Sequence, residues 1–149
     1  MKALLVAGLP VLGVLAMPIL FIGGGLQHPD IPTVALQAYV DAAEAAAEAE
    51  PSCAISWSLL AAIGKVESDH GRHGGSQLDP AGRAAPPIIG IALDGTNDTA
   101  VVRDTDGGQL DGDPVWDRAV GPMQFIPSTW SRWGRVGEGD GRADPQDIH

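Results

Sequence analysis

A helix is indicated by the stretch Trp57-Ser-Leu-Leu-Ala-Ala-Ile-Gly-Lys-Val-Glu67-Ser-Asp-His-Gly71. At about 100° per residue, Leu60, Ile63 and Glu67 fall on one side of this helix, and Lys65 points away. We therefore expect Glu67 to lie on the buried, apolar face. Burial favours the protonated form of a carboxylic acid, which a general acid needs when it protonates a poor leaving group. The ordinary alternative is a Glu that ends the helix, extends its carboxylate into solvent or pairs with a base, and has no chemical role.

A second motif follows further along the chain, in the stretch Ala119-Val-Gly121-Pro-Met-Gln124-Phe-Ile-Pro127-Ser-Thr-Trp130. Together with the pair Glu67-Ser68, it resembles the soluble lytic transglycosylase family of peptidoglycan-cleaving enzymes. The likeness is strongest to the membrane-bound lytic transglycosylase B branch of that family. The block from Gly121 to Trp130 is very specific, whereas the Glu-Ser pair alone is weak. The resemblance implies a lysozyme-like fold.

The resemblance also implies a reaction. Glycoside cleavage commonly uses two carboxylates, but the family that this chain resembles works with one. By this likeness, Glu67 is the catalytic residue, first as acid and then as base. The β-1,4 bond between MurNAc and GlcNAc is cleaved without water, which leaves a 1,6-anhydroMurNAc end. The implied partner is the peptidoglycan glycan strand, and no cofactor is expected.

The candidates for substrate binding are Ser68, Gly121, Met123, Gln124 and Phe125. Ser68 either positions Glu67 or touches the substrate. Gly121 permits close backbone approach, and Met123 offers an adaptable apolar wall. Gln124 supplies a donor and an acceptor for an N-acetyl amide. Phe125 could stack on a sugar face, although an aromatic at this spacing is more often core, and we expect Trp130 and Trp133 to be core.

The N-terminal stretch from Ala3 to Gly25 is uncharged and about 23 residues long, enough to cross the hydrocarbon core of a bilayer. Lys2 precedes it, which predicts a cytoplasmic amino terminus. We therefore expect residues 1–25 to be a signal anchor of a single-pass protein of the bacterial cell membrane, with an extracytoplasmic domain. A cleaved signal peptide and a secreted domain are the alternative.

The remaining chain predicts a mainly α, lysozyme-like helical domain over residues 32–149, after a short linker at 26–31. Helices are expected at 32–50 and at 52–68 with Ser52 as its cap. Pro122 and Pro127 are further candidate helix starts, and Asp144-Pro145 is expected to begin one more helix. Between them, about 71–118, lies a Gly/Asp-rich insertion in which 88–93 and 99–102 suggest a hairpin. The family pattern continues beyond His149, so we expect a domain that is incomplete at its C-terminus.

The formal net charge of −10 makes nucleic acid a poor partner. The weak candidates for a metal site are Asp104, Asp106, Asp111 and Asp113. Their loop begins like a calcium loop but lacks the Gly and bidentate Glu of an EF-hand, so Asx turns are favoured over calcium. His70 and His73 form too small a set for a metal site. Cys53 is a lone cysteine, which could pair between chains, have lost its partner or be a buried, inert thiol.

Two further functions stay open. In one, an Asp of the insertion supplies a base and the chain is a hydrolytic muramidase. In the other, the domain binds peptidoglycan without cleaving it. The chemistry of the product ends separates the first from transglycosylation, and any release of product excludes the second.

Overall fold

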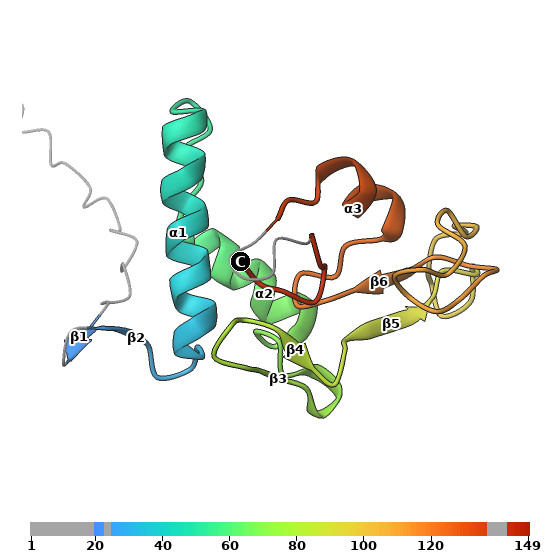
Figure 1. The fold of residues 1–149 in the computed structure, drawn as a ribbon, viewed down its shortest axis with the longest axis horizontal. Coiled ribbons are helices and arrows are strands. Elements are labelled where there is room, and N and C mark those ends of the chain that lie inside the picture. Colours follow the sequence, from blue (N-terminus) through green and yellow to red (C-terminus); the bar gives the residue numbers. More distant parts are fainter. Residues whose placement is uncertain (1–19, 23–24, 137–142) are drawn as a thin grey trace, which may run out of the picture.

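The computed structural model describes residues 20–22, 25–136 and 143–149 (Figure 1). Three α-helices are described, namely α1 (Thr33–Ala49), α2 (Trp57–Ser68) and α3 (Pro127–Trp133), together with a 3-10 turn, η1 (His73–Gly75). The strands are β1 (Leu20–Ile22), β2 (Gly25–Gln27), β3 (Gln77–Leu78), β4 (Ala84–Ala85), β5 (Ile89–Ala92) and β6 (Arg118–Val120). They form three two-stranded antiparallel sheets, β1-β2, β3-β4 and β5-β6.

The prediction of a mainly α fold is wrong. Helices α1 and α2 appear where they were expected, but the long segment between α2 and α3 consists of short strands, turns and irregular loops. Its many glycines adopt positive φ, among them Gly82, Gly95 and Gly108, and this backbone conformation cannot continue an α-helix. The described fold is therefore a pair of packed helices joined to a loop-rich, weakly β-structured region.

The expected membrane anchor lies largely outside the described residues. Its described part is strand rather than helix: β1 pairs antiparallel with β2, with Leu20 opposite Gln27. Phe21 and Ile22 are aromatic and β-branched, which suits extended backbone. Within the described ranges, no helix has the length and apolar character needed to cross a bilayer. This finding contradicts the predicted single-pass membrane localisation.

Helix α2 begins later than predicted. Ser56, not Ser52, is its N-cap, and the Ser56 side chain accepts a hydrogen bond from the backbone N–H of Leu59 at 3.2 Å. Ser52 instead donates to the Glu50 carboxylate, in the exposed turn after α1. Cys53 lies in the same turn as an exposed free thiol. The prolonged turn allows α2 to cross α1 rather than to continue it (Figure 1).

The core is small and is centred on the crossing of α1 and α2. Ala35 and Tyr39 from α1 and Ala61 from α2 are buried together. Around them pack Ile31, Trp57, Leu60, Leu78, Met123 and Ile148, which come from all parts of the chain. Gly64 lets the helices approach closely, because a Cβ placed there would lie 2.0 Å from the Tyr39 hydroxyl oxygen.

Gly64→Ala should therefore destabilise the protein, although Gly→Ala inside a helix normally stabilises by about 1 kcal/mol. We expect a loss of about 1–3 kcal/mol in the free energy of unfolding, since the Tyr39 ring is buried and cannot move aside freely. Urea unfolding of the two chains measures the change. In a Tyr39→Phe background the same substitution should cost less; an equal cost in both backgrounds would show that the hydroxyl is not the obstacle.

The described C-terminal segment, residues 143–149, is bound to the β-structured region by backbone and side-chain hydrogen bonds. Gln146 accepts from the Ile88 N–H at 2.8 Å and donates from Nε2 to the Ile88 carbonyl oxygen at 3.0 Å. The Ala84 N–H donates to the Gln146 carbonyl oxygen at 2.9 Å, and the Ile148 N–H to that of Gly82 at 3.1 Å. This segment thereby closes one side of the core.

The expected hairpin within the insertion is only partly present. Strand β5 lies where the first strand was predicted, but it pairs with β6, whose Val120 lies opposite Ile89. The second predicted strand contributes the bridge between Asp94 and Val101. The loop between β5 and β6 projects to the right-hand end of Figure 1, away from α2.

Candidate functional site

Glu67 lies in the last turn of α2 with its side chain exposed to solvent. The buried face of α2 consists of Ala61, Gly64 and Ser68, which are small and allow close contact with α1. The larger Ile63 and Leu59 remain on the outer side, 39% and 51% exposed. The prediction that Glu67 lies on the buried face is therefore wrong, since the helix packs by its small residues and not by its most apolar ones.

The Glu67 carboxylate has no hydrogen bond or ion pair to any residue that the structure describes. Pairing of Glu67 with a base is therefore not observed, whereas an exposed carboxylate at the end of the helix is what the ordinary alternative expected. The basic side chain of this turn, Lys65, pairs instead with Asp69. An unpaired, exposed carboxylate next to apolar side chains is free to meet a ligand.

Ser68 joins the two sequence motifs. Its hydroxyl donates to the Pro122 carbonyl oxygen at 2.6 Å and accepts from the Gly71 N–H at 2.8 Å. The residue is 1% exposed, so its side chain offers no surface to a substrate. Of the two roles that the sequence allowed, this position fits the positioning of Glu67, because the bond fixes the end of α2 against the Gly121–Gln124 turn.

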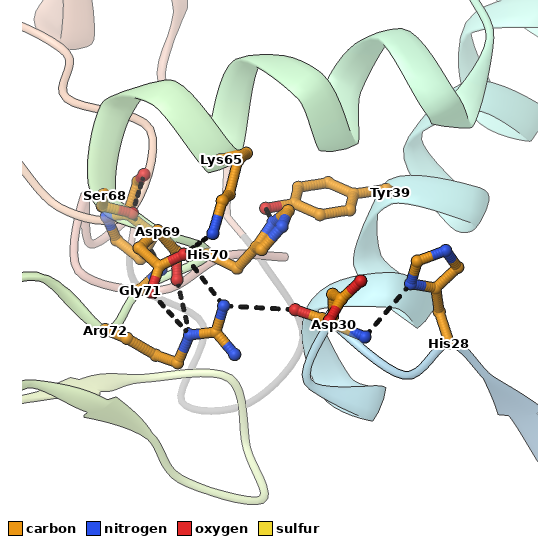
Figure 2. Close-up of polar contacts among 10 residues, drawn as sticks. His28, Asp30, Tyr39, Lys65, Ser68, Asp69, His70, Gly71 and Arg72 are labelled. Carbon is orange, nitrogen blue, oxygen red and sulfur yellow. Dashed lines mark hydrogen bonds and ion pairs between the residues drawn. The ribbon is translucent and has the colours of Figure 1, made fainter.

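The turn after α2 is held by an ionic cluster, which Figure 2 shows. Asp69 adopts a left-handed conformation and ends the helix. Its carboxylate accepts hydrogen bonds from Arg72 and Lys65, which lower the pKa of Asp69 to about 2. Arg72 also donates to the Asp30 carbonyl oxygen at 3.1 Å, which connects this turn to the segment before α1. Asp69 is thus ionised and engaged, which makes it a poor candidate for a second catalytic base.

His70 and Tyr39 form a buried polar pair between α2 and α1. The Tyr39 hydroxyl lies 3.2 Å from Nδ1 of His70, and the two side chains are 3% exposed. Burial raises the pKa of Tyr39 to about 12 and lowers the pKa of His70 from its usual 6.5. The positive charges of Arg72 and Lys65 lower the His70 pKa further, and Asp69 opposes them. The pair is therefore neutral in the folded protein at neutral pH.

Stability should consequently fall in mild acid. Because the folded-state pKa of His70 is below 6.5, the unfolded chain binds the proton more readily, and the free energy of unfolding decreases as the pH falls from 6.5 through the folded pKa. The lowered pKa of Asp69 has a separate effect: it reduces the free energy of unfolding only when the pH falls below 3.8, the usual pKa of an aspartate. Urea unfolding between pH 7 and 5 measures the slope, and His70→Gln should flatten it. An unchanged slope in that variant would assign the effect to another group.

Residues Gly121 to Gln124 form a tight turn. On either side of it, the Val120 N–H donates to the Phe125 carbonyl oxygen at 2.8 Å, and the Phe125 N–H donates to the Val120 carbonyl oxygen at 3.1 Å. Gly121 has a φ of +77°, and a Cβ there would lie 1.6 Å from the Pro145 carbonyl oxygen. The close approach expected at this glycine is thus made to the protein's own C-terminal segment. Met123 packs on the helical core. Gly121 is therefore buried in the turn, whereas Met123 is half-buried and contacts the core from one side.

Gln124 and Phe125 are more accessible. Gln124 is half-buried, and its Nε2 donates to the Gly121 carbonyl oxygen at 2.9 Å, so this donor is already used within the turn. Phe125 is 39% exposed, and its ring lies 5.9 Å from that of Trp130. Trp133 is 61% exposed, so the expectation that it belongs to the core is wrong. These aromatics provide an exposed surface beside the turn.

The carboxylates of the insertion are engaged in local turns. Oxygen atoms of Asp104, Asp106 and Asp117 lie within 4.8 Å of one another. Asp104 and Asp106 accept hydrogen bonds from backbone N–H groups of the following residues, as in Asx turns, and the buried Asp117 accepts from Thr105. The candidates Asp111 and Asp113 do not join this group: they bind the backbone N–H and the side chain of Arg118. Asp117 belongs to the same acidic stretch of the sequence but was not among the predicted metal candidates.

No family model, curated protein or solved structure matches the chain in the comparisons with known proteins.

Proposed function

We propose that the chain cleaves the β-1,4 bond between MurNAc and GlcNAc in bacterial peptidoglycan by lytic transglycosylation, with Glu67 as acid and base. The observation that carries this proposal is the hydrogen bond from Ser68 to the Pro122 carbonyl oxygen, at 2.6 Å. It places the Glu-Ser pair against the Gly-Pro-Met-Gln turn, although the two lie far apart in the sequence. The resemblance of these motifs to the transglycosylase family requires such a meeting.

Exposure of Glu67 fits a polymeric substrate. Leu59, Ile63 and Val66 expose 51%, 39% and 83% of their surface, and Ile63 lies one helical turn before Glu67. A glycan strand that covered these side chains would also remove water from the carboxylate. Desolvation would then favour the protonated acid at the moment when the substrate is bound.

In this proposal, protonated Glu67 donates its proton to the oxygen of the glycosidic bond, and the bond to C1 breaks. The N-acetyl group of the substrate stabilises the positive charge that develops at C1. The Glu67 carboxylate then removes the proton from the 6-hydroxyl of the same sugar, whose oxygen bonds to C1. The products are a 1,6-anhydro end and a free 4-hydroxyl, and Glu67 is protonated again.

Hydrolysis with a second carboxylate is less well supported. The acidic loop between β5 and β6 projects away from α2 in Figure 1, whereas two carboxylates of a glycosidase lie within about 5–10 Å of each other. Asp69 is closer in sequence, but Arg72 and Lys65 occupy its carboxylate. These positions favour the mechanism with a single carboxylate.

A binding module without activity is the second candidate, because Glu67 has no hydrogen-bond partner in the described structure to orient it. Sedimentation with insoluble purified peptidoglycan, followed by assay of the supernatant for soluble sugar fragments, separates the two. The proposed enzyme releases fragments. Sedimentation of the chain without any release would favour the binding module.

A further inference from the structure

The turn that follows Glu67 and Ser68 has a strained backbone. Asp69, His70 and Gly71 have φ values of +53°, +58° and +81°, so three consecutive residues adopt the left-handed conformation. This conformation costs a residue that has a Cβ about 1–2 kcal/mol, and two of the three have one. Strain of this kind persists only where surrounding contacts hold it, and it is common at functional sites. The contacts of this turn therefore decide how the end of α2 is presented.

His70 is the part of the turn that reaches into the protein. The residue is 3% exposed, and its Nδ1 lies 3.2 Å from the Tyr39 hydroxyl oxygen on α1 (Figure 2). The next residue, Gly71, donates its N–H to the Ser68 hydroxyl at 2.8 Å, and this hydroxyl donates to the Pro122 carbonyl oxygen at 2.6 Å. The position of the His70 ring is thus linked, through one peptide group, to the contact that joins the two motifs.

The surroundings of His70 favour the uncharged ring. The groups that act on it electrostatically are Lys65, Asp69, Arg72 and His28. Burial is the largest cause that lowers the pKa of His70, the cations Arg72 and Lys65 lower it further, and Asp69 opposes them. Tyr39, which faces the ring from α1, carries no charge at neutral pH, because burial raises its pKa to about 12. A protonated ring is therefore stabilised better by water than by its place in the fold.

We infer that His70 is a positioning residue of the candidate site. In its uncharged form the buried ring holds the left-handed turn, and through the Ser68 hydroxyl it keeps Glu67 beside the Gly121–Gln124 turn. In its charged form the ring moves toward solvent, the backbone gives up its strained conformation, and Ser68 loses its contact with the Gly121–Gln124 turn. The inference rests on the proposed function, to which it adds control by pH.

A pH profile separates this role from that of Glu67. The proposed reaction begins with protonated Glu67, so the titration of Glu67 limits the rate only on the alkaline side. A fall of the rate on the acid side requires a second group that has to be unprotonated, and His70 supplies it. Below the folded-state pKa of His70, the rate of cleavage at low peptidoglycan concentration should fall about tenfold for each pH unit.

His70→Asn tests the inference. Asparagine has no charge at any pH, its amide stands at the same number of bonds from the backbone as Nδ1, and it tolerates positive φ better than most residues. This variant should lose the fall of the rate on the acid side. His73→Asn is the matched control, because His73 lies three residues further on, in η1, and is exposed. It should keep the wild-type profile.

Nuclear magnetic resonance of the ¹⁵N-labelled full chain measures the linkage without any cleavage. The Met123 N–H belongs to the peptide group whose carbonyl oxygen accepts from Ser68, so its signal should move with pH together with the imidazole signals of His70. It should stay fixed in His70→Asn. A Met123 signal that does not move while the His70 ring titrates would overturn the inference. So would a fall of the rate in acid that persists in His70→Asn, or that coincides with cooperative unfolding followed by circular dichroism.

Glu67→Gln separates a failure of this inference from a failure of the proposed function. Loss of cleavage in this variant, with the coupled movement of the His70 and Met123 signals retained, supports both. If the variant cleaves as well as the wild type while the two signals still move together, the catalytic proposal fails and the link between His70 and Ser68 stands. If cleavage is lost but the Met123 signal does not follow His70, the inference about His70 fails alone.

Discussion

Glu67→Gln is expected to lower the rate of peptidoglycan cleavage by about 10²–10⁴-fold, the range that one general acid–base group contributes. The amide keeps the size of the side chain but can neither donate a proton to the glycosidic oxygen nor accept one from the 6-hydroxyl. The fold should be unaffected, because Glu67 is exposed and makes no hydrogen bond in the described structure. The release of soluble muropeptides from purified peptidoglycan measures the rate.

Glu48→Gln is the matched control for this prediction. Glu48 is another exposed helical glutamate, but it lies on α1, outside the candidate site. The substitution makes the same change of net charge and should leave the rate unchanged. Equal rates for the wild-type chain and Glu67→Gln would exclude Glu67 as the catalytic residue.

Gly121→Ala should cause the largest loss of stability. The new Cβ would lie 1.6 Å from the Pro145 carbonyl oxygen, and the φ of +77° is unfavourable for any residue that has a Cβ. Overpacking against backbone and conformational strain together should cost about 3 kcal/mol or more. For a chain of this size, such a loss lowers Tm by about 6–12 °C. Thermal unfolding followed by circular dichroism measures the shift.

Gly74→Ala is the control that separates backbone strain from a steric clash of the new Cβ. Gly74 also has a positive φ, +65°, but a Cβ there would meet nothing within 4 Å. Gly74→Ala should lower the free energy of unfolding by only about 1 kcal/mol, which is the strain of the left-handed conformation alone. If the two variants had equal Tm values, the packing of the C-terminal segment on Gly121 would not hold in solution.

Helix positions were predictable from the sequence. The helical spacing of apolar residues predicted α1 and α2 to within a few residues, and Pro127 marked the start of α3. The Gly/Asp-rich insertion after α2 was expected, but the mainly α class was wrong because the segment between α2 and α3 forms short antiparallel strands and turns and no α-helix. The expected helix starts at Pro122 and Pro145 are wrong as well, since both residues lie in turns. Between α2 and α3, glycines with positive φ and short pairings such as β5 with β6 decide the path of the chain. Pairings between distant residues leave no periodic signal in either strand.

The orientation of Glu67 was not predictable from hydrophobicity. The apolar pattern placed Leu60, Ile63 and Glu67 on the inner side of α2. Leu60 does pack against the core, but Ile63 and Glu67 are exposed, and the fully buried positions are Ala61, Gly64 and Ser68. Contact between crossing helices depends on how closely their axes approach, and the Tyr39 ring needs a partner without a side chain. A small-residue spacing in α2 was the available signal. This signal competes with the stronger apolar signal of the larger side chains, of which Leu59, Ile63 and Val66 remain exposed.

The meeting of the two motifs was expected only through the family resemblance. The bond of Ser68 to Pro122 spans 54 residues, and no local pattern of sequence specifies it. The structural role of Gln146 was not predicted. Its side-chain amide binds the backbone N–H and carbonyl oxygen of Ile88, and no sequence pattern indicates such a contact. Both contacts depend on how the loop-rich region folds back onto the helices.

The mass of the sugar ends released from purified peptidoglycan tests the central claim most directly. Transglycosylation by Glu67 predicts fragments whose muramyl ends are lighter by one water than hydrolysis products, and these should be lost in Glu67→Gln. Release of only hydrated, reducing ends, or of no fragments by the wild-type chain, would contradict it.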